Sequence, residues 1–321
     1  MISDFGTTTT GQTVHKITLT NGTLTAAILT KGGTLQSVRL AGVPHDLTLG
    51  SDDLADYEGK MSSFGSLIAP VVNRLTDAQA PIGGVIHSFE ANQNHRHTAH
   101  SGACSTRHKI WTIDHADETS TTLSLDLPNQ EGNFPGNRHV IATFSLTDAA
   151  LRMEVTATTD TLTIFNAANH SYWNLDGTQT WAGHTLQIAA DRYLPTTEEF
   201  TPTGQIAPVA GHYDLRLPRA ILPQTDAYDT NFCLADARRS IRDVLWLTGF
   251  SGLTLTMATT EPGIQVYDGR NAIRPGKQAY EGLAFEAQGW PDAPNHAGFP
   301  TIELAPGETY QQITEWRFSR A

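Results

Sequence analysis

Two short segments of this chain carry the residue types that acid–base chemistry requires. Residues 169–175 place His170 among aromatic and amide side chains, and residues 285–288 place Glu286 between apolar neighbours. An imidazole with an ordinary pKa of about 6.5 exchanges protons near neutral pH, and a carboxylate can act as its partner. The two segments together predict a proton-transfer pair in a polar, aromatic-lined site, which suits sugar chemistry.

Each member of this pair also has a structural interpretation. A histidine in an aromatic strand often donates to a backbone carbonyl, and a glutamate between apolar residues often forms a salt bridge or a buried hydrogen bond. Leu283 and Phe285 indicate that Glu286 lies in a buried strand. A carboxylate there loses solvation, which raises its pKa toward the working range of a base. The residues alone leave both interpretations open.

Six short motifs, in a fixed order along the chain, resemble those of the aldose 1-epimerase (galactose mutarotase) family. They are Asn73-Arg74, Ala99-His100-Ser101-Gly102, residues 169–175, Asp229-Thr230-Asn231-Phe232, Pro262-Gly263-Ile264-Gln265 and residues 285–288, with Pro291-Asp292-Ala293 behind them. One such motif is unspecific, whereas six in order are hard to obtain by chance. The resemblance runs from about residue 17 to the C-terminus.

The resemblance implies a role for each matching residue. Glu286 is the implied base for the anomeric hydroxyl, and His170 is the implied acid for the ring oxygen. The implied sugar contacts are Asn73, Arg74, His100, Tyr172, Trp173, Asp229 and Gln265. Arginine and asparagine donate, aspartate accepts, and glutamine and histidine do either, so the set matches sugar hydroxyls. The Trp173 ring would stack on a pyranose, although it could equally fill the core.

The implied activity is interconversion of the α and β anomers of a free aldose, a hexose or a pentose, without a cofactor. Two alternatives from other classes remain open. A non-catalytic sugar-binding sandwich would not need both His170 and Glu286. A glycoside hydrolase or lyase would need a second carboxylate at a suitable distance, for which Asp229 is the candidate.

The chain departs from the family pattern at several positions. Trp173 stands in place of Phe, Thr230 in place of His, and Ala287 in place of Thr, while the implied acid and base are kept. The chemistry is therefore more firmly indicated than the preferred sugar.

The histidines at 95, 97 and 100 raise the question of a zinc site. Residues two apart on a strand share a face, so His95 and His97 could point together. A zinc site needs further ligands and partners that orient them, and no cysteine pair or His-Glu-x-x-His helix occurs nearby. We expect loop residues here, no metal and no cofactor.

Composition excludes several classes of partner. The 321 residues carry a formal net charge of −12, which repels a phosphate backbone and an anionic membrane surface. The first twelve residues lack the basic start and apolar stretch of a signal peptide, and no apolar run is long enough to span a membrane. Cys104 and Cys233 cannot form a disulfide framework. We expect a cytoplasmic protein whose partner is a small aldose; its oligomeric state is not indicated.

The strand patterns predict an all-β fold. Residues 16–20 and 23–30 flank Asn21-Gly22 as a hairpin, and residues 140–146 and 151–157 flank a second turn. Further strands are expected at 121–127, 184–189, 252–258 and 310–318. Helical patterns are limited to a capped turn at 51–57 and a helix at 236–245 capped by Asp236. Without a linker or repeat, residues 1–321 are expected to form one domain, a large antiparallel β-sandwich, and the resemblance implies the galactose mutarotase-like super-sandwich.

Overall fold

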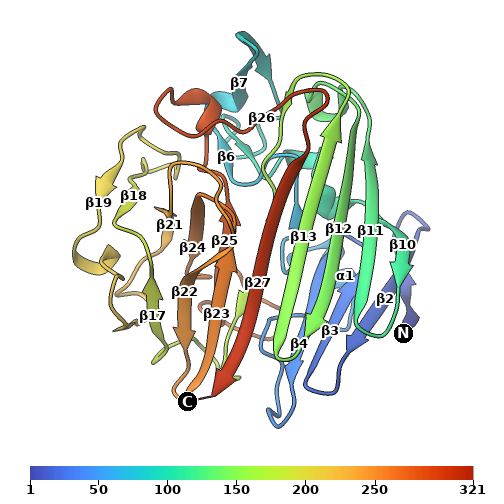
Figure 1. The fold of residues 1–321 in the computed structure, drawn as a ribbon, viewed down its shortest axis with the longest axis vertical. Helices are drawn as coiled ribbons and strands as arrows, with labels where there is room; N and C mark the ends of the chain where they lie inside the picture. The colour runs from blue at the N-terminus through green and yellow to red at the C-terminus, as the bar shows by residue number, and fades with distance from the viewer. Residues whose placement is uncertain (321) are drawn as a thin grey trace.

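Antiparallel strands are the main regular structure of the computed structural model, which describes residues 1–320 (Figure 1). The largest sheet contains, in spatial order, β10 (Thr112–Ala116), β11 (Ser120–Leu127), β12 (Arg138–Thr147), β13 (Ala150–Thr159), β27 (Tyr310–Arg320), β23 (Leu253–Thr259), β22 (Arg242–Thr248), β17 (Thr185–Ile188) and β20 (Arg219–Ala220). The second sheet contains β16 (Tyr172–Trp173), β25 (Leu283–Gln288), β24 (Gly263–Tyr267), β21 (Asp229–Cys233), β18 (Arg192–Leu194) and β19 (Ala207–Pro208). The third contains β1 (Ile2–Thr7), β2 (Thr13–Thr20), β3 (Leu24–Leu29) and β4 (Thr34–Leu40).

Four short strand pairs form separate two-stranded sheets. They are β5 (Leu67–Ile68) with β15 (Ala168–Asn169), β6 (Arg74–Leu75) with β9 (Thr98–Ala99), β7 (Gln79–Ile82) with β8 (Val85–Ser88), and β14 (Thr163–Ile164) with β26 (Glu303–Leu304). Within residues 1–320, the only α-helix is α1 (Leu54–Glu58), and no helix is long and apolar enough to cross a membrane. Short 3-10 turns lie at 76–78, 102–104, 106–108, 131–133, 211–213 and 293–295.

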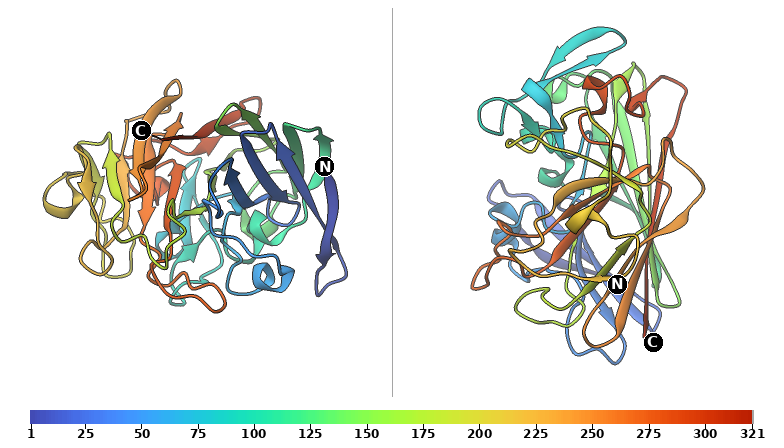
Figure 2. Two further views of the ribbon diagram at one scale, coloured as in Figure 1. Left: turned by 90° about the horizontal axis from the view of Figure 1, so that it is seen from below. Right: turned by 90° about the vertical axis from the view of Figure 1, so that its left-hand side faces the viewer.

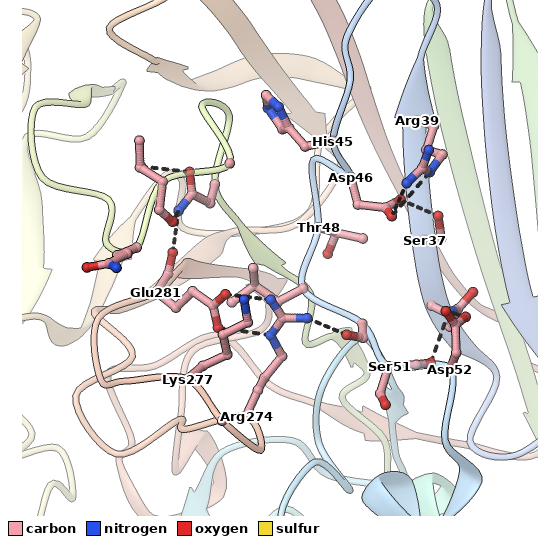
Figure 3. Close-up of a pocket in the computed structure, with 18 of the residues that line it drawn as sticks. Ser37, Arg39, His45, Asp46, Thr48, Ser51, Asp52, Arg274, Lys277 and Glu281 are labelled. Atoms are coloured by element: carbon pink, nitrogen blue, oxygen red, sulfur yellow. Dashed lines mark hydrogen bonds and ion pairs between the residues drawn. The ribbon is translucent and has the colours of Figure 1, made fainter.

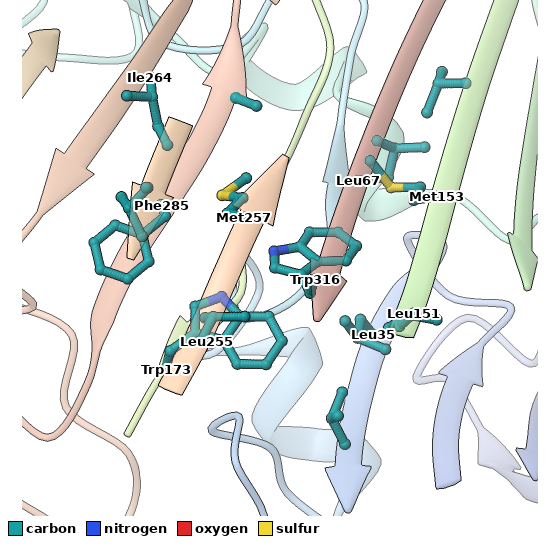
Figure 4. Close-up of a cluster of buried hydrophobic side chains, with 14 of the residues drawn as sticks. Leu35, Leu67, Leu151, Met153, Trp173, Leu255, Met257, Ile264, Phe285 and Trp316 are labelled. Atoms are coloured by element: carbon teal, nitrogen blue, oxygen red, sulfur yellow. The ribbon is translucent and has the colours of Figure 1, made fainter. Parts of the chain in front are cut away.

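Figure 2 shows two further views of how the sheets are layered. The main hydrophobic cluster joins buried side chains of the nine-stranded sheet with those of the two smaller sheets. Side chains alternate between the two faces of a strand, and β27 is buried at every second position from Tyr310 to Phe318. Trp316 from this strand belongs to one buried cluster with Met153, Leu255 and Phe285 of three other strands (Figure 4). The large antiparallel β-sandwich predicted from the sequence is confirmed.

Both predicted hairpins form. Strands β2 and β3 pair from Thr20 opposite Thr25, across a turn in which Gly22 adopts a φ of 83°. Strands β12 and β13 pair from Thr147 opposite Ala150. The capped turn is also confirmed, because the Asp53 side chain accepts a hydrogen bond from the backbone N–H of Ala55 at the start of α1.

The predicted helix at 236–245 is wrong. Residues 242–248 form β22, which pairs with both β23 and β17 inside the largest sheet. A break in register between Asp243 and Leu245 places Val244 and Leu245 on buried positions in succession, which obscures the alternation of a strand. Pairing with two neighbouring strands outweighs the local capping signal at Asp236.

We expect Leu255→Ala to lower the free energy of unfolding by about 2–5 kcal/mol, because it empties space in a close-packed core. Leu255 is fully buried, whereas Leu217 is 77 % exposed. Leu217→Ala is therefore the matched control and should change stability by less than about 0.5 kcal/mol. Urea unfolding followed by tryptophan fluorescence measures both, and equal effects would contradict the assigned core.

Candidate active site

One face of the six-stranded sheet carries a row of polar side chains. Asn231 of β21 lies opposite Gln265 of β24, which in turn lies opposite Glu286 of β25. Residues two apart on a strand share a face, so Asp229 joins this row and Tyr172, on β16, lies on the same face. The intervening residues point into the core. The strand alternation therefore separates a polar floor from the hydrophobic interior.

The backbone of residues 65–66 fixes the position of His170. The His170 N–H donates to the Ser66 carbonyl at 3.0 Å, and the Gly65 N–H donates to the His170 carbonyl at 2.9 Å. The Asn169 side chain also donates to the Gly65 carbonyl, at 2.7 Å. His170 Nε2 consequently lies 3.5 Å from Glu286 Oε1, so the structure brings together the two residues of the predicted proton-transfer pair.

Burial shifts the pKa values of this pair in opposite directions. Their side chains are 6 % and 3 % exposed. Desolvation raises the pKa of Glu286 to about 8, with a further contribution from the negative charge of Asp229. Desolvation also lowers the pKa of His170 to about 4. Between these values the pair holds one proton and carries no net charge. Within residues 1–320, His170 Nδ1 and Glu286 Oε2 have no hydrogen-bond partner.

A charged cluster lies beside the pair. The Arg74 guanidinium donates to both carboxylate oxygens of Asp229, at 3.0 and 3.4 Å. Gln265 donates to the same carboxylate at 2.6 Å, and Arg74 Nε donates to Gln93 Oε1 at 3.1 Å. Hydrogen bonds between charged partners are the stronger ones, so this cluster holds its donors and acceptors in a fixed arrangement.

Asn73 and His100 lie next to the charged cluster and the proton-transfer pair, on two neighbouring turns. His100 Nδ1 accepts from the Asn73 N–H at 3.2 Å, and the His100 N–H donates to the Asn73 carbonyl at 2.8 Å. Because Nδ1 accepts, the hydrogen of neutral His100 lies on Nε2. The His100 and His170 rings meet edge to face with centroids 5.5 Å apart. Burial lowers the pKa of His100 well below its usual range, so it stays a neutral donor.

Tyr172 and Trp173 point in opposite directions from adjacent positions of β16. The Tyr172 ring lies 5.1 Å from the His170 ring, on the polar face. Trp173 is fully buried, with its ring 5.9 Å from Trp316 and 5.7 Å from Phe318 (Figure 4). The prediction that Trp173 stacks on a sugar is therefore wrong, because the alternation of the strand turns this ring into the core.

Four further residues of this region were not predicted. Asn231 and Gln288 lie two residues beyond Asp229 and Glu286 on the same strands, and their buried amide groups have no hydrogen-bond partner in the described part of the chain. The two-residue spacing could have identified them. Gln93 and Phe200 approach Arg74 from loops, and no local sequence signal marks them.

His95 and His97 lie in different environments. His97 is buried, accepts from the Asp77 N–H at 3.0 Å and lies 3.1 Å from Glu199, whereas His95 is exposed. No group of three histidine, cysteine or acidic side chains within residues 1–320 is placed to hold a metal ion.

A polar cavity of about 990 Å³ is lined by none of the predicted site residues (Figure 3). Its charged side chains bind one another: Arg39 pairs with Asp46 at 3.1 Å, and Arg274 pairs with Glu281. Neither His170 nor Glu286 lines it. The cavity is therefore not the place where the proton-transfer pair meets a ligand.

Comparison with known proteins identifies the family. The aldose 1-epimerase family model matches residues 15–317. Galactose mutarotase from Mus musculus is 32 % identical over 97 % of this chain and 96 % of its own length, and aldose 1-epimerase from Escherichia coli (strain K12) is 29 % identical over 96 % of both chains.

Solved structures agree with these matches. A GalM/aldose epimerase homologue from C. elegans superposes with a TM-score of 0.89 and 27 % identity, covering 95 % of this chain and 99 % of the other. Galactose 1-epimerase from Lactobacillus acidophilus gives a TM-score of 0.88 and 26 % identity, covering 100 % and 98 %. The chain therefore belongs to the aldose 1-epimerase family.

Proposed function

We propose that this protein interconverts the α and β anomers of a free aldose. The observation that carries the proposal is the buried His170–Glu286 pair, 3.5 Å apart, beside the Arg74–Asp229–Gln265 cluster. The pair supplies one proton donor and one acceptor, and the cluster supplies groups that bind hydroxyls. The relatives named galactose mutarotase and aldose 1-epimerase share this family.

Ring opening requires two proton transfers, one at each member of the pair. Ionised Glu286 takes the proton of the anomeric hydroxyl, while protonated His170 donates to the ring oxygen as the bond from C1 to that oxygen breaks. The open-chain aldehyde then rotates about its C1–C2 bond. Closure reverses both transfers, so the pair returns to its starting protonation and the other anomer leaves.

Asn73, Arg74, His100, Asp229 and Gln265 bind the remaining hydroxyls in this proposal, and the Tyr172 ring lies against the sugar. Neutral His100 serves as a donor through Nε2, because its Nδ1 already accepts from the backbone of Asn73. A hydrogen bond to a charged group contributes about 1.5–3 kcal/mol, against about 1 kcal/mol for a neutral pair. Arg74 and Asp229 therefore set the orientation of the sugar.

The geometry favours this activity over hydrolysis. A glycoside hydrolase needs two carboxyl groups that flank the scissile bond. Asp229 is bound by Arg74 and Gln265, and two strand spacings, about 10 Å, separate its strand from that of Glu286. Asp229 is thus occupied as a binding group and does not act as a second catalytic carboxylate.

We also propose the setting in which the enzyme acts. Its substrate is a small hexose or pentose, it uses no cofactor, and residues 1–321 act as one domain, since the family model spans nearly the whole chain. A cytoplasmic location is supported by two free cysteines, of which Cys233 is buried, because cytosolic proteins keep their thiols reduced.

We expect Glu286→Gln to lower kcat for anomer exchange by about 10²–10⁴-fold, because glutamine keeps the shape and removes the base. Polarimetry of freshly dissolved α-galactose and α-glucose, corrected for the uncatalysed rate, measures this. Glu118→Gln is the matched control, since Glu118 is exposed, and should leave kcat unchanged. Normal turnover by a folded Glu286→Gln protein would show that this carboxylate is not the base.

We expect His170→Asn to reduce kcat to a similar extent, and the double variant with Glu286→Gln to lose little more than the worse single variant. The two groups act as a unit, so the second removal costs little once the first has stopped the cycle. The same polarimetric assay tests this expectation. Fully additive losses would indicate independent roles for the two residues.

We expect kcat/KM to form a plateau between about pH 4 and about pH 8, the pKa values of His170 and Glu286. Below the plateau both groups are protonated and no base remains; above it both are deprotonated and no donor remains. Each limb should fall about tenfold per pH unit. Initial rates across this range measure the profile, and a rate that keeps rising above pH 9 would contradict the one-proton requirement.

A further inference from the structure

Phe200 is an exposed aromatic side chain in a constrained backbone position. It lies in the loop between β18 and β19, is 39 % exposed and has a φ of 63°. A bulky residue rarely adopts a positive φ, and such strain persists only where the surrounding structure fixes it. The position of this ring is therefore determined by its neighbours.

Several contacts hold the loop in place. The Phe200 N–H donates to the Thr197 carbonyl at 3.0 Å, and the loop closes through a bridge between Thr196 and Pro202. Gln93, which also binds Arg74, donates to the Glu199 carbonyl at 3.1 Å. The Glu199 carboxylate lies 2.8 Å from Arg96 and 3.1 Å from His97. The loop is thus tied to the turn that also positions Arg74.

The ring lies beside the charged cluster of the site. Its centroid is 5.3 Å from the Arg74 guanidinium carbon, and Arg74 binds Asp229. Glu286 lies two strands away from Asp229, a spacing of about 10 Å. A pyranose with C1 at Glu286 therefore places C4 toward Phe200.

We propose that Phe200 is a specificity-determining sugar contact, with its ring packed against the C–H groups at C3, C4 and C5. The inference rests on the proposed function of this site. In a galactose-configured sugar, the axial C4 hydroxyl leaves these three C–H groups on one continuous apolar face. A glucose-configured sugar instead turns its C4–H to the opposite face, so that only the C–H groups at C3 and C5 remain on this one. The ring accordingly favours the galactose configuration.

Steady-state kinetics of Phe200→Ala, Phe200→Leu and Phe200→Tyr on galactose and glucose test the proposal. We expect Phe200→Ala to raise KM for galactose about threefold to tenfold, the range of an aromatic contact, with kcat unchanged and with a smaller effect on glucose. Phe200→Tyr keeps the ring and should retain the wild-type KM. Phe200→Leu keeps apolar cover over Arg74 but lacks the ring, and should behave like Phe200→Ala.

Phe250→Ala is the matched control, because Phe250 is 91 % exposed and lies in the turn between β22 and β23; it should leave both kinetic constants unchanged. Circular dichroism confirms folding of each variant. An unchanged KM in Phe200→Ala, full rescue by leucine, or a loss of kcat instead of KM would each overturn the sugar contact. A wild-type protein inactive on every aldose would overturn the proposed function itself, which separates the two failures.

Discussion

Desolvation of two titratable groups is the constraint on which the site depends. A carboxylate and an imidazole that are nearly inaccessible to water both favour their uncharged forms, so in the empty enzyme the shared proton rests on Glu286 and His170 is neutral. In the proposed cycle this is the protonation state reached after the sugar ring opens. The resting protonation state of the pair is therefore the one that accompanies the open-chain intermediate. Binding of the cyclic sugar must shift the proton from Glu286 to His170 before the ring can open.

The sandwich supplies much of this burial. The floor of the site is a sheet whose opposite face is covered by the core, where Trp173, Phe285 and Trp316 pack together. Water is excluded from below by that core. From the sides, the backbone of residues 65–66 and the turns that carry Asn73 and His100 fix the polar groups through main-chain hydrogen bonds. The donors and acceptors are consequently arranged before any sugar binds, as electrostatic preorganisation requires.

Much of this could be predicted from the sequence, because alternation and turn chemistry are local signals. The hairpin at Asn21-Gly22 follows from local spacing, whereas the roles of Glu286, Asp229 and Gln265 were indicated only by the family resemblance. Trp173 shows where prediction from the sequence stops. Tyr172 faces the site and its neighbour Trp173 faces the core, and aromatic character does not reveal which face of a two-residue strand each side chain takes. The helix expected at 236–245 was wrong because pairing with strands distant in the sequence makes residues 242–248 a strand. Gln93 and Phe200 were not predicted because only the folded chain brings their loops to Arg74.

The register that aligns Asn231, Gln265 and Glu286 across three strands also constrains how this protein can change over evolution. Inserting or deleting a single residue within β24 would turn each following side chain to the other face of the sheet. A core residue would then replace Gln265 in the site, and an amide would lie inside the sandwich. Length variation is therefore expected in the loops that reach over the site and not in its floor. New sugar preferences can arise by remodelling those loops, while the catalytic arrangement is inherited unchanged.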